Sequence, residues 1–150
     1  MPTAITDALR GEHGVLYRLL DHLEREIAGA SAAQGRELGA FLAAALVNHS
    51  HLEDELLFTA VEGFLGAESG PLVVMRHEHA AIEGGLERLQ QAATAEEARS
   101  AAAAVVETAR AHFAKEEQIL FPLAERFLGG ERLAELGRRW AERSAVAVAA

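Results

Sequence analysis

The chain has 150 residues, of which half are hydrophobic and a quarter are charged, and its formal net charge is −9. This length is enough to bury a substantial core, and the acidic balance argues against a protein that follows nucleic-acid phosphates. Because the chain has no cysteine, a disulfide scaffold, a thiolate metal site and thiol chemistry are excluded.

The first two predicted elements are long amphipathic helices. Apolar residues recur at steps of three and four, which predicts a helix over about Thr3–Ala28. The order Ser31-Ala-Ala-Gln34 has the form of a capping box that begins a second helix. This second helix is expected to run to about Leu65, with Gly66 as its C-terminal cap.

Two more long helices follow. The third is predicted to begin at Pro71, because proline fits the first turn of a helix. Within it, Gly84-Gly85 marks either a close approach of a neighbouring helix or nothing of structural importance. The capping-box order Thr94-Ala-Glu-Glu97 opens the fourth helix. Pro122 is expected to kink or end that helix, which stops at Gly129-Gly130.

These elements predict an all-α fold. Four long amphipathic helices with short links form an antiparallel up-down-up-down four-helix bundle, here over about residues 3–129. A short C-terminal fifth helix, about Glu131–Ser144, is expected to pack on the bundle through residues such as Trp140. We expect a single domain over residues 1–150. No apolar run of about 18 residues and no leader-like start is visible, so we expect a cytoplasmic protein without membrane spans.

Two stretches of the sequence occur twice. His49-Ser-His-Leu-Glu53 returns later in the chain as His112-Phe-Ala-Lys-Glu116. Glu12-His13 returns as Glu78-His79, at a nearly equal separation. The chain is therefore a doubled unit, with a lone histidine on one helix and His-x-x-x-Glu on the next. The two helical hairpins are expected to be related by pseudo-twofold symmetry.

Metal binding is the function that this doubled set favours. A histidine and a glutamate four residues apart share one helix face, and six such side chains fall on the predicted apolar faces. The predicted ligands are His13, His49, Glu53, His79, His112 and Glu116. An isolated buried carboxylate is costly, but a glutamate that bridges two cations has that cost offset. Mixed imidazole and carboxylate ligands suit iron, manganese or zinc, and of these we predict two irons.

A packed, hydrogen-bonded histidine is the alternative interpretation of any one of these residues. The duplication argues against it, because independent core histidines would not recur with their partners at matched offsets. Three histidines outside the set fall off the apolar faces, namely His22, His51 and His77. We expect His22 and His51 at the surface, and His77 does not share a helix face with His79.

Further candidates lie beside the predicted ligands. Tyr17 and Glu83 occupy equivalent positions of the repeat, one turn after each lone histidine. Glu83 is either a seventh ligand or a surface glutamate near the site. Tyr17 donates a hydrogen bond to a bound oxygen species, coordinates a metal, or packs with a hydrogen bond, and we favour the last. Four flanking glutamates are candidates for holding the ligands in place, namely Glu12, Glu55, Glu78 and Glu117.

Together these motifs resemble the hemerythrin-like (HHE cation-binding) family over about residues 5–128. The resemblance rests on Glu12-His13, His49-x-x-x-Glu53, Glu78-His79 and His112-x-x-x-Glu116 with Leu120-Phe121-Pro122. It implies a four-helix bundle with a non-haem di-iron centre, oxo- or hydroxo-bridged. By position it makes the four histidines terminal ligands and the two glutamates the bridges.

One position departs from the oxygen-carrying members of that family. Those proteins have a second histidine on the third helix where this chain has Glu83. The pattern H–HxxxE–H–HxxxE resembles the bacterial hemerythrin-like branch instead. An anionic ligand at this position is expected to favour ferric iron and to disfavour reversible oxygen carriage.

Four functions follow as hypotheses. The first is a redox enzyme of the catalase or peroxidase type, active in oxidative stress, that disproportionates or reduces hydrogen peroxide. The second binds or senses O2 or NO without turnover, and the third handles iron. The fourth is a purely structural bundle without metal. We expect small ligands such as O2, H2O2 or NO, no nucleic acid and no membrane, and a monomer or weak homodimer.

Overall fold

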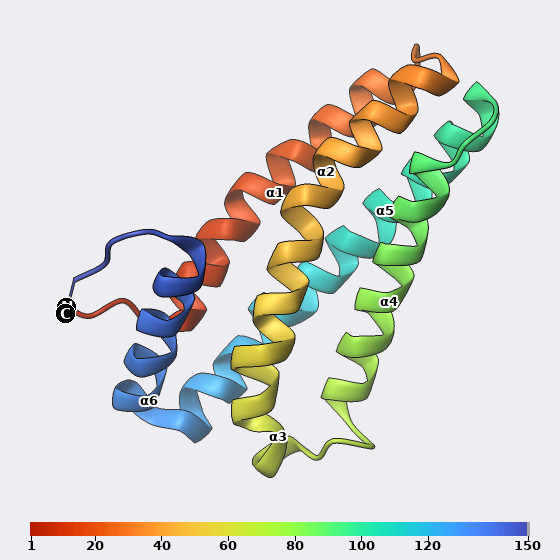
Figure 1. The fold of residues 1–150 in the computed structure, drawn as a ribbon. Coiled ribbons are helices and arrows are strands. Elements are labelled where there is room, and N and C mark those ends of the chain that lie inside the picture. The colour runs from red at the N-terminus through yellow and green to blue at the C-terminus, as the bar shows by residue number, and fades with distance from the viewer. Residues whose placement is uncertain (150) are drawn as a thin grey trace.

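Four long antiparallel helices run along the molecule in the computed structural model, which describes residues 1–149 (Figure 1). In chain order the elements are α1 (Ile5–Ile27), α2 (Ala32–Leu52), η1 (Glu53–Phe58), α3 (Thr59–Leu65), α4 (Pro71–Gln90), α5 (Ala95–Lys115), η2 (Glu116–Leu120) and α6 (Phe121–Ser144). Helix α1 packs on α2 and α5, and α4 packs on the same two helices. The predicted all-α, up-down-up-down four-helix bundle is confirmed.

The helix starts follow the predicted capping residues, with one difference. The side chain of Ser31 accepts a hydrogen bond from the backbone N–H of Gln34, and the Gln34 side chain accepts one from the N–H of Ser31. At the start of α5, Thr94 accepts a hydrogen bond from the N–H of Glu97. The Glu97 carboxylate, however, accepts from the N–H of Ala93 and not from that of Thr94. The second capping box is therefore displaced by one residue.

Each helix that carries a His-x-x-x-Glu motif changes to a π-helix at the glutamate. The segment η1 begins at Glu53 and η2 begins at Glu116, at equivalent positions of the repeat. A π-helical turn holds one more residue than an α-helical turn, and such turns are frequent at functional sites. The second helix, predicted as one α-helix to about Leu65, is thus continuous but passes through a π-helical segment.

The fourth predicted helix does not end at Pro122 but continues to Gly129, where the glycine pair predicted its end. Pro122 lies in the first turn of α6, directly after η2. Proline is tolerated at such a position because the first turn makes little use of its missing N–H. The chain leaves helical geometry only at Gly129, where φ is 72° and ψ is 165°. The predicted fifth helix is the part of α6 after this break, here called the C-terminal limb (residues 130–144).

The C-terminal limb turns back along the bundle and packs beside the start of α1 (Figure 1). After the limb, Val146, Ala147 and Val148 line a surface hollow together with Thr3 and Asp7. The contact is close: a Cβ atom added to Gly137 would lie 1.9 Å from the carbonyl oxygen of Thr3. This limb is the one helical part that the internal repeat does not duplicate.

The buried apolar residues form two clusters, one towards each end of the bundle. The distal core lies towards the links between α1 and α2 and between α4 and α5, and it consists of Leu16, Leu20, Leu23, Ile27, Leu42, Leu46, Ile82, Leu86, Leu89, Ala92, Ala98, Ala101, Ala102, Val105, Val106, Ala109 and Phe113. The proximal core lies towards α3 and α6, and it consists of Ile5, Leu9, Leu52, Leu56, Leu57, Phe58, Val61, Leu72, Met75, Leu120, Phe121, Ala124, Leu133 and Leu136.

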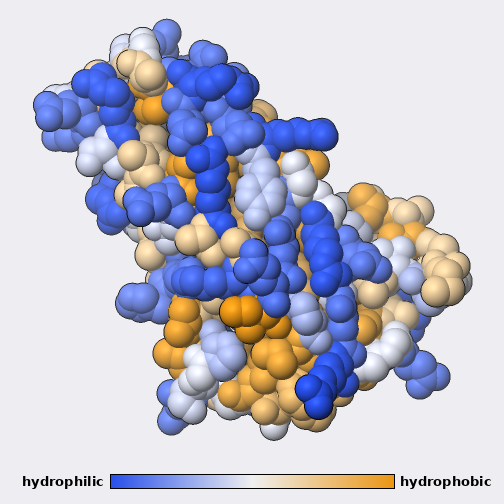
Figure 2. All heavy atoms as spheres, turned by 180° about the vertical axis from the view of Figure 1, so that it is seen from behind, coloured by the Kyte–Doolittle hydropathy of each residue, from blue (hydrophilic) through white to orange (hydrophobic). Residues whose placement is uncertain are grey.

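Apolar side chains also gather on the surface at the proximal end (Figure 2). Phe64 of α3 and Phe127 of α6, which are equivalent in the repeat, stack there with ring centroids 5.3 Å apart while 55% and 40% exposed. None of the helices within residues 1–149 is long and apolar enough to cross a membrane.

Candidate metal centre

The six predicted ligands come together between the two cores. On α1, for example, His13 lies between Leu9 of the proximal core and Leu16 of the distal core. All six side chains are buried, with residue exposures of 3% or less. They are His13 of α1, His49 of α2, Glu53 of η1, His79 of α4, His112 of α5 and Glu116 of η2.

Their ligand atoms form two groups of four that share both glutamates. The first group is His13, His49, Glu53 and Glu116, and the second is Glu53, His79, His112 and Glu116. Within each group the nitrogen and oxygen atoms all lie within 4.8 Å of one another. Each group can therefore hold one metal ion, with Glu53 and Glu116 available to both.

The Nε2 atom of every histidine faces the shared glutamates. Glu53 contacts one histidine of each group, with Nε2 of His49 2.7 Å from Oε1 and Nε2 of His79 3.3 Å from Oε2. Glu116 does the same: Nε2 of His13 lies 3.0 Å from Oε2, and Nε2 of His112 contacts Oε1. Each carboxylate thus places one oxygen in each group, as a bridging ligand must.

The Nδ1 atoms of the histidines point away from the glutamates, towards a second set of carboxylates. On one side, Nδ1 of His49 lies 2.5 Å from Glu12, and Nδ1 of His13 lies 2.8 Å from Glu117. A proton on Nδ1 that is donated outwards leaves Nε2 with a lone pair for a metal. Carboxylates in this position also fix the orientation of the ring.

The other pair of histidines repeats this arrangement. Nδ1 of His79 forms a hydrogen bond with Asp54 at 3.0 Å, whereas Nδ1 of His112 lies 3.4 Å from Glu78 without forming one. In both halves the outer carboxylate comes from an adjacent helix and is the chain neighbour of another ligand. Of the four flanking glutamates predicted to hold ligands, Glu12, Glu78 and Glu117 lie beside a ligand imidazole.

Glu55 does not belong to this set, and Asp54 takes its place. The Glu55 carboxylate lies at the surface and pairs with Arg143 of the C-terminal limb at 2.6 Å. Asp54 could have been found from the repeat, because it follows Glu53 directly, just as Glu117 follows Glu116. Sequence reasoning considered glutamates and missed the aspartate.

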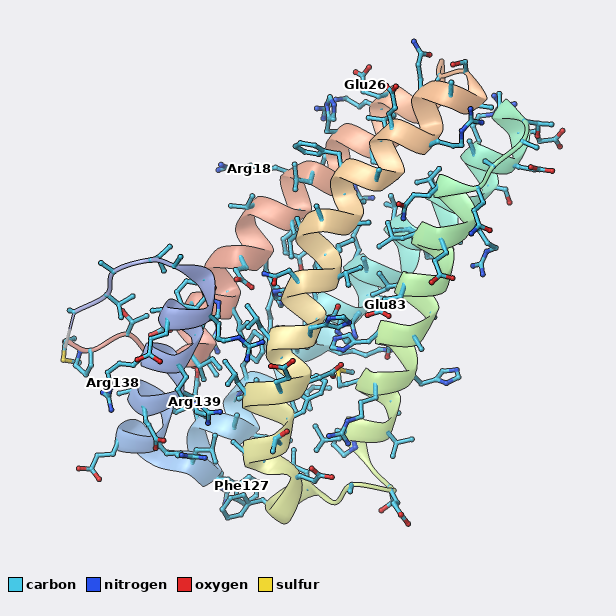
Figure 3. All side chains as sticks on the ribbon, viewed as in Figure 1. Arg18, Glu26, Glu83, Phe127, Arg138 and Arg139 are labelled. Atoms are coloured by element: carbon cyan, nitrogen blue, oxygen red, sulfur yellow. The ribbon has the colours of Figure 1, made fainter. Side chains whose placement is uncertain are left out.

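Tyr17 and Glu83 both lie outside the two ligand groups. The Tyr17 hydroxyl donates a hydrogen bond to Glu117 at 3.0 Å, so it reaches the His13 imidazole only through that carboxylate. The Glu83 carboxylate is partly exposed and pairs with Nε2 of His51 at 3.1 Å, on the side of α4 that faces α2 (Figure 3). The equivalent positions of the repeat therefore differ in role. His22 and His77 are exposed, off the buried faces of their helices, as predicted.

Aromatic rings close the centre against water. Phe113 stacks on the His13 ring with centroids 4.2 Å apart, and Phe58 stacks on His79 at 5.3 Å. Phe121 also stacks on the His13 ring, with centroids 5.4 Å apart. All three phenylalanines are fully buried. Electrostatic interactions inside such a dry site are strong.

The ionisation of the cluster reflects this burial. For His13 and His49, burial alone would lower the pKa, but the neighbouring glutamates outweigh it and raise the values to about 9 and about 10. For His79, Asp54 and the two glutamates likewise outweigh burial and raise the pKa to about 11. Burial would raise the pKa of Glu53, but its histidine neighbours hold it well below its usual range. The Glu53 carboxylate is therefore anionic, and a cation beside it would stabilise this buried charge.

The donor atoms fit metal cations. Both carboxylate oxygens of Glu53 and of Glu116, and the Nε2 atoms of His79 and His112, are buried without a hydrogen-bond partner of suitable geometry. Leaving such groups unpaired is costly. Two cations that each accept two imidazole nitrogens and share two carboxylates would satisfy all of these atoms.

Comparison with known proteins agrees with this geometry. The sequence model of a family described as the hemerythrin HHE cation binding domain matches residues 4–124 and, in a second placement, residues 70–143. The starts of the two matches are separated by the same interval as His13 and His79. No curated protein and no solved structure gives a significant match. The chain belongs to the hemerythrin HHE cation-binding domain family.

Proposed function

We propose that this hemerythrin HHE domain holds two non-haem irons, and that it binds or reduces small oxidants there, with hydrogen peroxide as the first candidate and O2 and NO as the others. The observation that carries the proposal is the pair of ligand groups that share Glu53 and Glu116. A site for one ion would not need two complete groups with common carboxylates. Imidazole and carboxylate donors suit iron, and the family match is to a cation-binding domain.

Two adjacent irons would supply Lewis acidity and exchangeable electrons for an oxidant. The chain would supply the rest. Each ion would receive two histidine nitrogens and one oxygen from each glutamate, which leaves coordination positions for an exogenous ligand. The carboxylates Glu12 and Glu117 orient the imidazoles of His49 and His13. Phe113 limits water at the centre.

The decisive experiment is metal analysis followed by reaction with peroxide. We expect about two irons per chain after anaerobic reconstitution, and O2 evolution or sustained peroxide consumption on mixing with hydrogen peroxide. Glu53→Gln is expected to lose both iron and turnover. The matched control Glu83→Gln, which changes a glutamate paired at the surface with His51, is expected to keep both. An iron-free reconstituted protein would contradict the proposal.

Binding of O2 or NO without turnover is the second candidate, and one observation favours it. The Glu83 carboxylate pairs with His51 and is outside both ligand groups. An extra anionic ligand was the reason to disfavour reversible oxygen carriage, and this placement removes that reason. Two irons with no peroxide turnover, together with spectral changes that reverse when the gas is removed, would establish this function instead.

A further inference from the structure

The two halves of the metal centre differ in what holds their outer carboxylates. Glu12, beside His49, accepts a hydrogen bond from the indole Nε1–H of Trp140 at 2.8 Å. Glu78, the equivalent residue beside His112, accepts one from the ammonium group of Lys115 at 2.7 Å. A neutral donor therefore holds the first carboxylate and a cation holds the second.

This difference has a geometric counterpart at the histidines. The distance between Nδ1 of His49 and Glu12 is 2.5 Å, whereas that between Nδ1 of His112 and Glu78 is 3.4 Å. A carboxylate shared with an ammonium group has less negative charge to offer an imidazole. A strong hydrogen bond from Nδ1–H to a carboxylate makes Nε2 a better donor to a metal. His49 is therefore the better placed ligand of the two.

The distances from the other two histidines to their outer carboxylates differ in the same direction between the two ligand groups. His13 lies 2.8 Å from Glu117, which also accepts a hydrogen bond from the neutral Tyr17 hydroxyl. His79 lies 3.0 Å from Asp54. Both histidines of the first ligand group thus have the shorter contact to an outer carboxylate, and a neutral donor holds each of those carboxylates.

Trp140 reaches the centre from outside the internal repeat. It is on the C-terminal limb, partly buried against the proximal core, and the limb packs on the start of α1. We propose that Trp140 is a positioning residue for the metal centre, acting through Glu12 on His49, so that the His13/His49 position binds its metal more tightly than the His79/His112 position. This inference rests on the proposed metal function, and it assigns the C-terminal limb a role in that function.

Titration of the metal-free protein with Co²⁺ tests the inference, because Trp140 is the only tryptophan of the chain. A paramagnetic ion bound next to His49 is expected to quench Trp140 fluorescence. In the wild type, quenching should be complete with the first equivalent, while the visible Co²⁺ absorption continues to rise over the second. Equal filling of both positions, or quenching only with the second equivalent, would overturn the proposed order.

Two variants test the route through Glu12. Trp140→Phe keeps an aromatic ring and removes the N–H, and it is expected to weaken the first Co²⁺ step by about tenfold or more while leaving the second unchanged. Glu12→Gln keeps the fluorophore, and it should weaken the same step and reduce early quenching. A structural role alone would lower the melting temperature of metal-free Trp140→Phe but leave both Co²⁺ affinities as in the wild type, and that result would overturn the proposal.

Lys115→Met is the matched control, because it changes the equivalent contact of the other half. We expect it to alter only the second Co²⁺ step. An equal effect of Lys115→Met and Trp140→Phe on the first step would overturn the proposal. Failure of this inference is distinguishable from failure of the proposed function. Two equivalent Co²⁺ ions in every variant would remove the inference alone, whereas a wild type that binds no metal would overturn both.

Discussion

The distal and proximal parts of the bundle are built in different ways, although the internal repeat contributes helices to both. The distal core is made of regular α-helices whose packing depends on small residues. A Cβ atom added to Gly35, Gly39 or Gly85 would lie within 2.8 Å of a side-chain carbon of a neighbouring helix. The proximal part contains both π-helical segments, the break at Gly129 and the C-terminal limb.

The distal and proximal parts therefore have different roles in the fold. Close packing in the distal core, with surface ion pairs such as Arg110 with Asp21, fixes the spacing of the helices without any metal. The proximal part can then accommodate irregular backbone that places Glu53 and Glu116 in the centre. The ligands lie at the boundary, where a rigid frame on one side limits their movement. We therefore expect the fold of the distal part to survive loss of the metal.

The largest expected effect is that of Glu53→Gln on metal binding. Glu53 belongs to both ligand groups, so its loss should weaken both positions by about 100-fold or more, since even residues that only orient ligands contribute about 10–100-fold. Loss of the Glu53 charge also leaves the protonated His49 and His79 imidazoles without a buried partner, so the metal-free variant should be less stable than the wild type. Metal analysis and thermal unfolding of the metal-free form measure the two effects. An unfolded variant would show that the two parts are not independent.

The pH dependence should have opposite signs for metal binding and for metal-free stability. The pKa values of His13, His49 and His79 are raised from 6.5 to about 9, 10 and 11. These groups stabilise the metal-free fold fully below pH 6.5, and that contribution is lost as the pH rises through 9 to 11. Metal needs neutral imidazoles, so its affinity should rise over the same range, with proton release on binding.

Two measurements on the wild type check these signs. Thermal unfolding of the metal-free protein at about pH 6.5 and at about pH 10 should show lower stability at the higher pH. Competition with a chelator over the same range, corrected for the protonation of the chelator, should show tighter metal binding at the higher pH. A metal-free form that becomes more stable with rising pH would contradict the charge assignment.

Gly85→Ala tests the close packing of the distal core. The added Cβ would lie 2.7 Å from Cγ2 of Val105 on α5, so the variant should lose about 1–3 kcal/mol of stability through overpacking. Gly84→Ala is the matched control. Its nearest contact is the flexible Arg88 side chain at 3.6 Å, and the gain in helix propensity should stabilise it by up to about 1 kcal/mol. Metal stoichiometry should be unchanged in both, and equal unfolding free energies would refute the close-packing argument.

These results also show which features could be predicted from the sequence. The capping residue Ser31 and the cap Gly66 mark helix ends because their local chemistry determines them. The convergence of the ligands could be predicted because two copies of His-x-x-x-Glu repeat with matched lone histidines. The sequence could not decide whether Gly85 marks a close approach of a neighbouring helix. That role depends on the position of Val105, which only the packed bundle defines.

Other features escaped prediction for physical reasons. A π-helical turn has no residue signature, so neither η1 nor its counterpart after Glu116 could be found from periodicity. Pro122 was expected to kink or end a helix, because the sequence does not reveal that a new α-helical turn begins there. The pairing of Glu83 with His51 depends on the rotation of two helices about their axes. That rotation is set by packing.

The smallest expected effect is that of Asp54→Asn on metal binding, measured against Glu55→Gln at the neighbouring residue. Asp54 lies 3.0 Å from Nδ1 of His79, whereas Glu55 pairs with Arg143 at the surface. Asp54→Asn should weaken metal binding at the His79/His112 position by about tenfold, or about 1.4 kcal/mol. Glu55→Gln should leave both affinities unchanged, because an exposed ion pair contributes little. Co²⁺ titration of the two variants measures both effects. If Asp54→Asn and Glu55→Gln bound Co²⁺ equally tightly, Asp54 would not support the His79 ligand. The orientation of His79 would then come from its packing against Phe58.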